Sequence, residues 1–258
     1  MLRWRFVTAL VLAPVVLGAI MLGRWAIMAV ILVVIAISAY ELARTLEPLP
    51  FPAAFGAGAL PVLLSIPYGA SGVLAGAVLS LPWAFFWLAG RPETRTLRTI
   101  LALLLMTLWV GAPLAHLVLV GELPDGSYLV LIAVVGPWIS DAGAYFAGRF
   151  FGRHKLLPAL SPKKTYEGAI GGLLATVVAV GYFTHEFLGV STVEAAILGV
   201  VISVFSHAGD LFESALKRLL DLKDLGRSLP GHGGILDRID SLLFAAPAVY
   251  YLYVFFMS

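Results

Sequence analysis

The sequence contains no cysteine, and charged residues make up only 12% of its 258 positions. The absence of cysteine excludes disulfides, thiolate catalysis and cysteine-ligated zinc sites. Soluble domains average about 45–50% apolar residues. In this chain, hydrophobic residues reach 60% and the mean hydropathy is +0.97. The formal net charge of +2 says little about partners, because in such an apolar chain the placement of charges matters more than their sum.

Apolar runs recur along the whole chain, and each is long enough to cross a hydrocarbon core of about 30 Å as an α-helix. The runs lack the alternation of a transmembrane β-barrel, and a helix satisfies its own backbone hydrogen bonds in lipid. The sequence therefore predicts an all-α, polytopic integral membrane protein with about nine transmembrane helices. We expect them at residues 5–22, 25–44, 53–69, 71–89, 97–119, 128–149, 167–188, 192–218 and 237–256.

Two features leave details of these spans open. The third and fourth spans contain several helix breakers, so one long hairpin could divide at more than one of Pro61, Pro67, Gly69 and Gly72. The glycine pairs Gly72–Gly76 and Gly168–Gly172 have the spacing of close helix packing, although ordinary glycine use in membrane helices explains them equally well. No polar connection is long enough to form a soluble domain.

The positive charges segregate to one side of the membrane when the chain is drawn with nine spans. Cytoplasmic loops of membrane proteins carry an excess of lysine and arginine, so the positively charged side, which includes the N-terminus, is predicted to be cytoplasmic. Of the 17 lysines and arginines, all except Arg24 fall on that side. They are Arg3, Arg5, Arg44, Arg91, Arg95, Arg98, Arg149, Arg153, Lys155, Lys163, Lys164, Lys217, Arg218, Lys223, Arg227 and Arg238.

Aspartates on three separate predicted helices lie near the cytoplasmic ends of those helices. At 1.5 Å per residue, Asp141 is about 20 Å and Asp210 about 27 Å into spans that enter from outside. Asp237 and Asp240 begin the last span from the cytoplasmic side. Because an ionised carboxylate is costly in the apolar region unless it is paired, each of these acids is a candidate functional residue.

The spacing around Asp210 places several polar side chains on one helical face. His207, Asp210, Ser214 and Lys217 follow steps of three or four residues. Converging carboxylates without cysteine favour a hard cation such as Mg²⁺. The alternative is a set of structural ion pairs with Lys217, Arg218 or Arg238.

Two polar segments offer sites for anions. Gly231, Gly233 and Gly234 precede the last helix, where exposed N–H groups can cradle a phosphate, although a plain tight turn would have the same appearance. The basic residues Lys223, Arg227 and Arg238 around this turn favour the phosphate interpretation. In the second segment, Ser161 and Pro162 predict a helix start, which puts Lys163 and Lys164 in the first helical turn. Positive charge there is unfavourable for the helix dipole, so a bound anion would be expected beside these lysines. The alternative is that they are ordinary cytoplasmic-side anchors.

Residues 214–240, SALKRLLDLKDLGRSLPGHGGILDRID, resemble the signature of the phosphatidate cytidylyltransferases, also called CDP-diacylglycerol synthases. The upstream segments SDAGAYFAGRFFGRHKL and SPKKTYEG are also similar to this family, with Ala142 where the family commonly has threonine. The resemblance covers about the last half of the chain in detail. It implies a Mg²⁺-dependent reaction in which CTP and phosphatidate give CDP-diacylglycerol and pyrophosphate.

From the residues and the resemblance together we assign roles as hypotheses. Catalytic roles go to Asp210, Asp237, Lys217 and Arg218, and metal binding to Asp141, Asp210, Asp237 and Asp240. Substrate binding is assigned to Lys163, Lys164, Ser214, Lys223, His232, Gly233, Gly234 and Arg238. Residues 1–120 are expected to provide packing and dimerisation, and residues 121–258 to provide the catalytic helices and polar loops.

The resemblance also implies the setting of the reaction. We expect a multi-pass protein of the inner (cytoplasmic) membrane, with its active site facing the cytoplasm. The expected partners are CTP, phosphatidate, the bilayer and a second copy of the chain in a homodimer, with no nucleic acid. Whether a monovalent cation shares the Mg²⁺ site is left open by the sequence.

Two rival functions remain at this point. An ion-coupled transporter would use intramembrane acids, but its charges belong near the midplane, between matching halves that this chain does not show. Another lipid-headgroup enzyme, such as a CDP-alcohol phosphotransferase, would carry closely spaced acids around D-G-x-x-A-R, which are absent.

Overall fold

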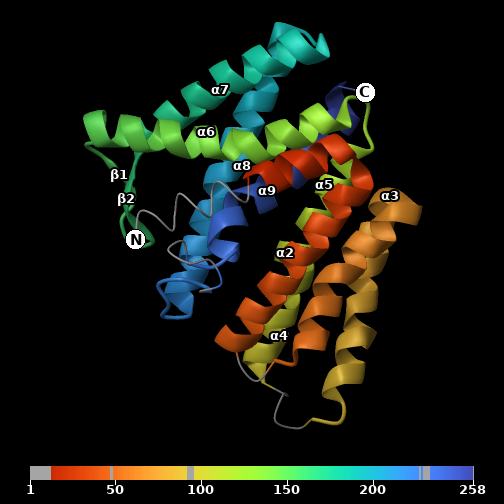
Figure 1. Ribbon diagram of the computed structural model, residues 1–258. Helices are drawn as coiled ribbons and strands as arrows, with labels where there is room; N and C mark the ends of the chain where they lie inside the picture. The colour runs from red at the N-terminus through yellow and green to blue at the C-terminus, as the bar shows by residue number, and fades with distance from the viewer. Residues whose placement is uncertain (1–12, 47–48, 92–95, 227, 229–232, 258) are drawn as a thin grey trace. The chain divides into compact units, whose positions relative to one another are not determined.

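The computed structural model describes residues 13–46, 49–91, 96–226, 228 and 233–257, which are mostly helical (Figure 1). Within these ranges, seven helices are long and apolar enough to cross a membrane. They are α2 (Arg24–Thr45), α3 (Phe51–Leu88), the helix Leu97–Gly121, α6 (Gly126–Phe151), α7 (Tyr166–Leu188), α8 (Thr192–Leu219) and the helix Leu236–Phe256. A shorter apolar helix covers Ala13–Leu22. The predicted all-α, multi-pass membrane fold is confirmed.

The helix α3 contains both the third and the fourth predicted spans. Its backbone leaves the helical conformation at Gly69, where φ is 58° and ψ is −140°, a region that glycine adopts without steric cost. The two halves then pack against each other, since a Cβ on Gly72 or Gly76 would collide with the backbone of Leu64 or Pro61. This break lies at the predicted boundary between the spans 53–69 and 71–89. The first predicted span lies partly outside the described residues, and the number of crossings and their orientation stay predictions.

The helix Leu97–Gly121 is built from three segments. They are α4 (Leu97–Leu104), a π-helical segment (Leu105–Gly111) and α5 (Ala112–Gly121). The π-helical segment packs tightly on α3, because a Cβ on Gly111 would collide with the Gly58 carbonyl oxygen. The last helix is α9 (Leu236–Leu252), which also continues in π-helical form over Tyr253–Met257.

The chain divides into two compact units. The first contains residues 1–127 and 224–239, and the second contains residues 128–223 and 240–258. In this division the segment 224–239 belongs with the N-terminal helices, and the expected roles of residues 1–120 and 121–258 stay predictions. In the first unit α2, α3 and α5 pack against one another, and in the second α7 packs along α8 (Figure 1).

Glycines set the helix spacing in the second unit. A Cβ on Gly172 of α7 would lie 2.6 Å from the carbonyl oxygen of Ser140 on α6, and one on Gly168 would lie 2.9 Å from that of Ala144. The Gly168–Gly172 spacing therefore marks a close helix contact, as the sequence suggested. Leu174 of α7 is 59% exposed. An exposed large apolar side chain is expected on a helix that faces lipid.

A short antiparallel hairpin joins α6 to α7. It pairs β1 (Lys155–Leu157) with β2 (Ser161–Thr165). The predicted helix start at Ser161 is wrong, because α7 begins at Tyr166, after a Thr165 side chain that accepts a hydrogen bond from the Gly168 N–H at 3.1 Å. Pro162 favours extended backbone in the residue before it. Because β2 continues to Thr165, Lys163 and Lys164 lie on a strand and not in the first turn of a helix.

We expect Gly172→Ala to destabilise the second unit. The new methyl group would overlap the Ser140 carbonyl oxygen, and overpacking of this kind costs about 1–3 kcal/mol. Thermal unfolding of the detergent-solubilised protein should show a lower midpoint. Gly181→Ala on the same helix is the control, since its methyl group would meet its nearest atom at an ordinary 3.7 Å. Equal midpoints for the two variants would show that the α6–α7 contact is loose.

Candidate active site

Three acidic side chains of α8 and α9 converge in the second unit. Asp210, Glu213 and Asp240 each offer a carboxylate oxygen, and these oxygens lie within 4.8 Å of one another. Glu213 is 2% exposed and Asp240 is 9% exposed. The helices approach closely because α8 has Gly209 at this level, where a Cβ would meet the Asp240 carbonyl oxygen and lie 3.1 Å from Cα of Ser241. Three carboxylates thus lie close together, and two of them, Glu213 and Asp240, are buried.

Two lysines compensate part of this charge. The ammonium group of Lys164, on β2, forms an ion pair with Asp210, and Nζ of Lys217 lies 2.7 Å from Oε2 of Glu213. Among the described side chains, none forms an ion pair with Asp240. Carboxylates this close repel each other unless further positive charge is nearby. The cluster therefore has the charge and the oxygen ligands that suit a hard divalent cation.

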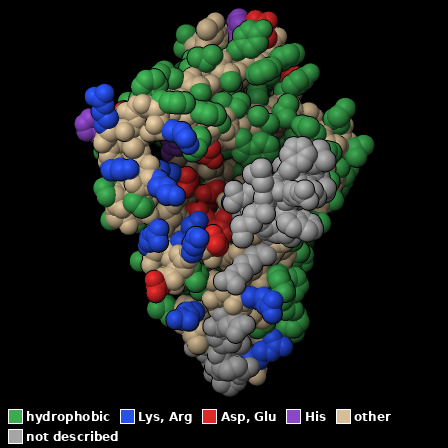
Figure 2. Space-filling view, turned by 60° about the vertical axis from the view of Figure 1, so that its left-hand side comes forward, with side chains coloured by type: hydrophobic (Ala, Val, Ile, Leu, Met, Phe, Trp, Pro, Cys, Tyr) green, Lys and Arg blue, Asp and Glu red, His purple; other side chains and the backbone are tan. Residues whose placement is uncertain are grey.

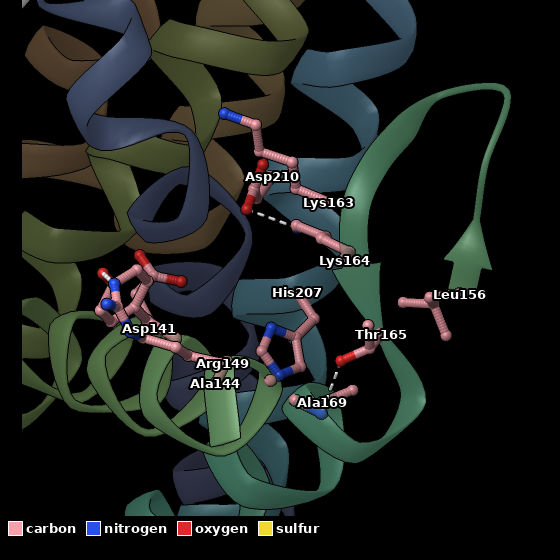
Figure 3. A pocket seen from close by; sticks show the side chains of 13 residues that line it. Asp141, Ala144, Arg149, Leu156, Lys163, Lys164, Thr165, Ala169, His207 and Asp210 are labelled. Atoms are coloured by element: carbon pink, nitrogen blue, oxygen red, sulfur yellow. Dashed lines mark hydrogen bonds and ion pairs between the residues drawn. The ribbon is translucent and has the colours of Figure 1, made fainter. Parts of the chain in front are cut away.

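A cavity of about 390 Å³ opens beside the acidic cluster. Figure 2 shows acidic side chains in a recess, with lysine and arginine side chains at its edge. The cavity is lined from α6, the β-hairpin, α7 and α8, and Figure 3 shows the Lys164 side chain reaching Asp210 beside the His207 ring. Its charged and imidazole-bearing lining residues are Asp141, Arg149, Lys163, Lys164, His207 and Asp210.

The helical face predicted around Asp210 is present on α8. His207 and Asp210 line the cavity together, and the Ser214 hydroxyl donates a hydrogen bond to Asp210 at 3.5 Å. Lys217 pairs with Glu213, an acid outside the predicted set, and the lysine that pairs with Asp210 is Lys164. Nε2 of His207 is buried without a hydrogen-bond partner among the described residues.

The other assigned residues of the second unit lie around the cavity or beyond it. Asp141 of α6 and Lys163 of β2 both line the cavity. The Arg218 guanidinium donates to the Leu160 carbonyl oxygen at 3.5 Å, so it contacts the turn of the hairpin. Lys223 is exposed after the end of α8.

The remaining assigned residues belong to the first unit, with the exception of His232, which lies outside the described residues. Those described are Gly233, Gly234, Asp237 and Arg238. Asp237 accepts hydrogen bonds from the N–H groups of Gly234 at 2.8 Å and Leu225 at 3.3 Å. The Gly234 N–H therefore already has an acceptor within the protein. Gly233 has a φ of 82°, which explains a glycine at this turn, and a role of the loop in phosphate binding stays a prediction.

Two buried acids lie outside the sequence assignments: Glu213, whose role the sequence left open, and Glu41, which it missed. Glu213 carried a signal, since it lies four residues before Lys217 in a charged segment, but a structural ion pair has the same spacing. Glu41 is a lone acid in the apolar span 25–44, and an ionisable residue inside a membrane helix is a functional candidate by default. Its carboxylate accepts hydrogen bonds from backbone N–H groups of the segment before α9.

Known proteins are similar in sequence to this chain. The family model of the cytidylyltransferase family matches residues 3–256. The phosphatidate cytidylyltransferase of Bacillus subtilis (strain 168) is 46% identical over 132 residues, which cover 51% of this chain and 49% of that protein. The proteins of the same name from Staphylococcus haemolyticus (strain JCSC1435) and Staphylococcus aureus (strain COL) are each 45% identical, over 125 and 128 residues, which cover 48% of both chains in each comparison.

The matched region spans about half the length of these curated relatives. The family model, in contrast, extends over nearly all of the sequence, including every helix that carries the acidic cluster and its cavity. The chain therefore belongs to the cytidylyltransferase family.

Proposed function

We propose that this membrane protein is a phosphatidate cytidylyltransferase, which converts CTP and phosphatidate into CDP-diacylglycerol and pyrophosphate. The observation that carries the proposal is the cluster of Asp210, Glu213 and Asp240 beside a lysine-lined cavity. Family membership and the names of the relatives support the same substrates.

The chemistry of this reaction needs few protein groups. An oxygen of the phosphatidate phosphate forms a bond to the α-phosphorus of CTP, and the bond from that phosphorus to the bridging oxygen of the β-phosphate breaks. Pyrophosphate leaves with the electron pair. Because the attacking oxygen is already ionised, no general base is required. The protein must hold two anions in line and neutralise the charge that develops on the phosphates.

The acidic cluster fits a divalent cation such as Mg²⁺. Asp210, Glu213 and Asp240 are the described residues that would hold it, and they supply the oxygen ligands that this ion prefers. When bound, the ion would stabilise negative charge on the reacting phosphates. Asp141 lines the adjacent cavity and is a further candidate ligand. Asp237 belongs to the other unit, where its carboxylate accepts two backbone hydrogen bonds, and its assignment as a ligand stays a prediction from the sequence.

The cations around the cavity would bind the phosphates of the substrates. Lys163, Lys164 and Arg149 line it, and phosphate oxygens accept hydrogen bonds from such groups. Lys164 already pairs with Asp210, so it would hold the carboxylate and a phosphate at the same time. His207 also lines the cavity and is a further candidate for substrate contact.

We further propose that this site faces the cytoplasm from the inner membrane. The support is the segregation of positive charge in the sequence, since all lysines and arginines except Arg24 are assigned to one side. A homodimer is proposed from the family resemblance. Cross-linking of the protein in native membranes tests the second proposal, and a monomer at all protein concentrations would contradict it.

Asp210→Asn is expected to lower the formation of CDP-diacylglycerol about 100-fold or more. The substitution removes a negative charge from the cluster and the partner of Lys164, and electrostatic groups at a reacting centre contribute effects of this size. The assay supplies phosphatidate and labelled CTP, with and without Mg²⁺, and measures lipid-soluble nucleotide. Glu186→Gln, an exposed acid of α7, is the control and should keep full activity. Near-normal turnover in Asp210→Asn would remove this residue from the site.

Mg²⁺ is expected to raise the thermal stability of the unliganded protein. Binding at 100 times the dissociation constant would add about 2.7 kcal/mol to the free energy of unfolding. Asp240→Asn should reduce this gain and raise the midpoint without Mg²⁺, because it relieves repulsion from Asp210 and Glu213. Thermal scans across a Mg²⁺ titration measure both effects. A gain of the same size in Asp240→Asn would place the cation elsewhere.

A further inference from the structure

Glu41 is a buried acid that the reaction described above does not use. It lies four residues before the end of α2, in a helix apolar enough to cross the membrane, and is only 3% exposed. Burying a carboxylate is costly unless it is paired with a cation or well hydrogen-bonded. The partners that Glu41 has therefore indicate why it is tolerated there.

Those partners are backbone N–H groups from both ends of one segment. Ser228 donates to Oε1 at 3.3 Å, Ile235 donates to Oε1 at 2.9 Å and Leu236 donates to Oε2 at 3.4 Å. Ile235 and Leu236 stand at the start of α9, where N–H groups have no partner within the helix. A carboxylate also suits the positive end of the helix dipole. Glu41 thus caps α9 from a distant part of the sequence.

Glycines bring the same segment close to Glu41. A Cβ on Gly226 would collide with the Glu41 carboxylate, and a Cβ on Gly234 would lie 2.7 Å from its Oε2 and 2.8 Å from Cα of Gly226. The two ends of the segment therefore meet at this carboxylate. A second contact reinforces the anchor, because the Thr45 hydroxyl, one turn further along α2, donates to the Leu225 carbonyl oxygen at 2.8 Å.

We propose that Glu41 is a positioning residue for the reaction: its carboxylate fixes the backbone at Gly226, at Ser228 and at residues 234–236, and thereby the start of α9. That helix carries Asp237 in its first turn and, three residues later, Asp240 of the acidic cluster. Glu41 does not touch the substrates, and it acts through the backbone that leads to these two acids. This inference rests on the proposed function for its effect on turnover, whereas the anchor itself can be tested without turnover.

Glu41→Gln is the central variant, because it keeps the shape of the side chain but replaces one acceptor oxygen by an NH₂ group that cannot accept. We expect kcat/KM for CTP to fall about tenfold or more, since buried N–H groups lose their acceptor. Glu122→Gln is the matched control in the same unit. It removes only an exposed ion pair with Arg24, which contributes little, so kcat/KM should not change.

Two readouts do not depend on turnover. Trypsin cleavage after Arg227, which the sequence places between Gly226 and Ser228, should be about tenfold faster in Glu41→Gln than in the wild type, because local opening costs less free energy. The gain in thermal midpoint on adding Mg²⁺ should also shrink, because Asp240 is no longer held in place. A purely structural role would lower the midpoint without Mg²⁺ and leave the size of the Mg²⁺ effect unchanged.

Gly226→Ala tests the same contact from the other side. Its methyl group would displace the Glu41 carboxylate, so this variant should reproduce the loss in kcat/KM and the faster cleavage. In the double variant with Glu41→Gln, the losses should not add, because both changes break one interaction. Additive losses would mean that the glycine acts independently of Glu41. If Glu41→Gln does not fold, Gly226→Ala carries the test alone.

The outcomes separate the two proposals. An inactive wild type would overturn the proposed function, and the cleavage and Mg²⁺ readouts would still decide whether Glu41 anchors the segment. Wild-type kcat/KM in Glu41→Gln would overturn the positioning role, even if cleavage becomes faster. Wild-type cleavage together with a wild-type Mg²⁺ effect would overturn the anchor itself.

Discussion

The structure depends on satisfying carboxylates that lie where water is scarce. Each unit satisfies them differently. In the second unit, Asp210 and Glu213 pair with lysines, one from a neighbouring strand and one from the next turn of the same helix. In the first unit, Glu41 has backbone N–H groups as its donors. Asp210 borders a cavity, next to which the proposed cation would bind, whereas the Glu41 carboxylate is already occupied by backbone N–H groups.

Close backbone approach is what makes both arrangements possible. Gly209 allows α8 to meet α9 at the level of Asp240, and Gly226 allows the loop to reach Glu41. The same device sets the spacing of α6 and α7 through Gly168 and Gly172. Without a hydrophobic driving force between helices in lipid, such contacts supply much of the packing. Gly209 therefore helps to build the acidic cluster, although it carries no functional group.

Much of the fold follows from the sequence, because the lipid requires long apolar helices, and the predicted spans after residue 24 coincide with described helices, the third and fourth together forming α3. Asp210 and Asp240 could also be identified as candidates, since an ionised side chain in a membrane helix is costly and usually has a functional role. The strand at Lys163 and Lys164 could not be predicted, because the Ser161–Pro162 pair also begins helices and the competing cap at Thr165 depends on pairing with β1. Glu41 was missed because its partners are backbone groups about 190 residues away, and backbone groups leave no trace in side-chain patterns.

The separation between Glu41 and its donors has a consequence for synthesis. A ribosome that adds about 5–20 residues per second needs roughly ten to forty seconds to travel from Glu41 to Leu236. During that time, α2 has entered the bilayer with an acid whose hydrogen-bond donors do not yet exist. The nascent chain must therefore keep this carboxylate hydrated or in contact with the insertion machinery until the C-terminal half is synthesised.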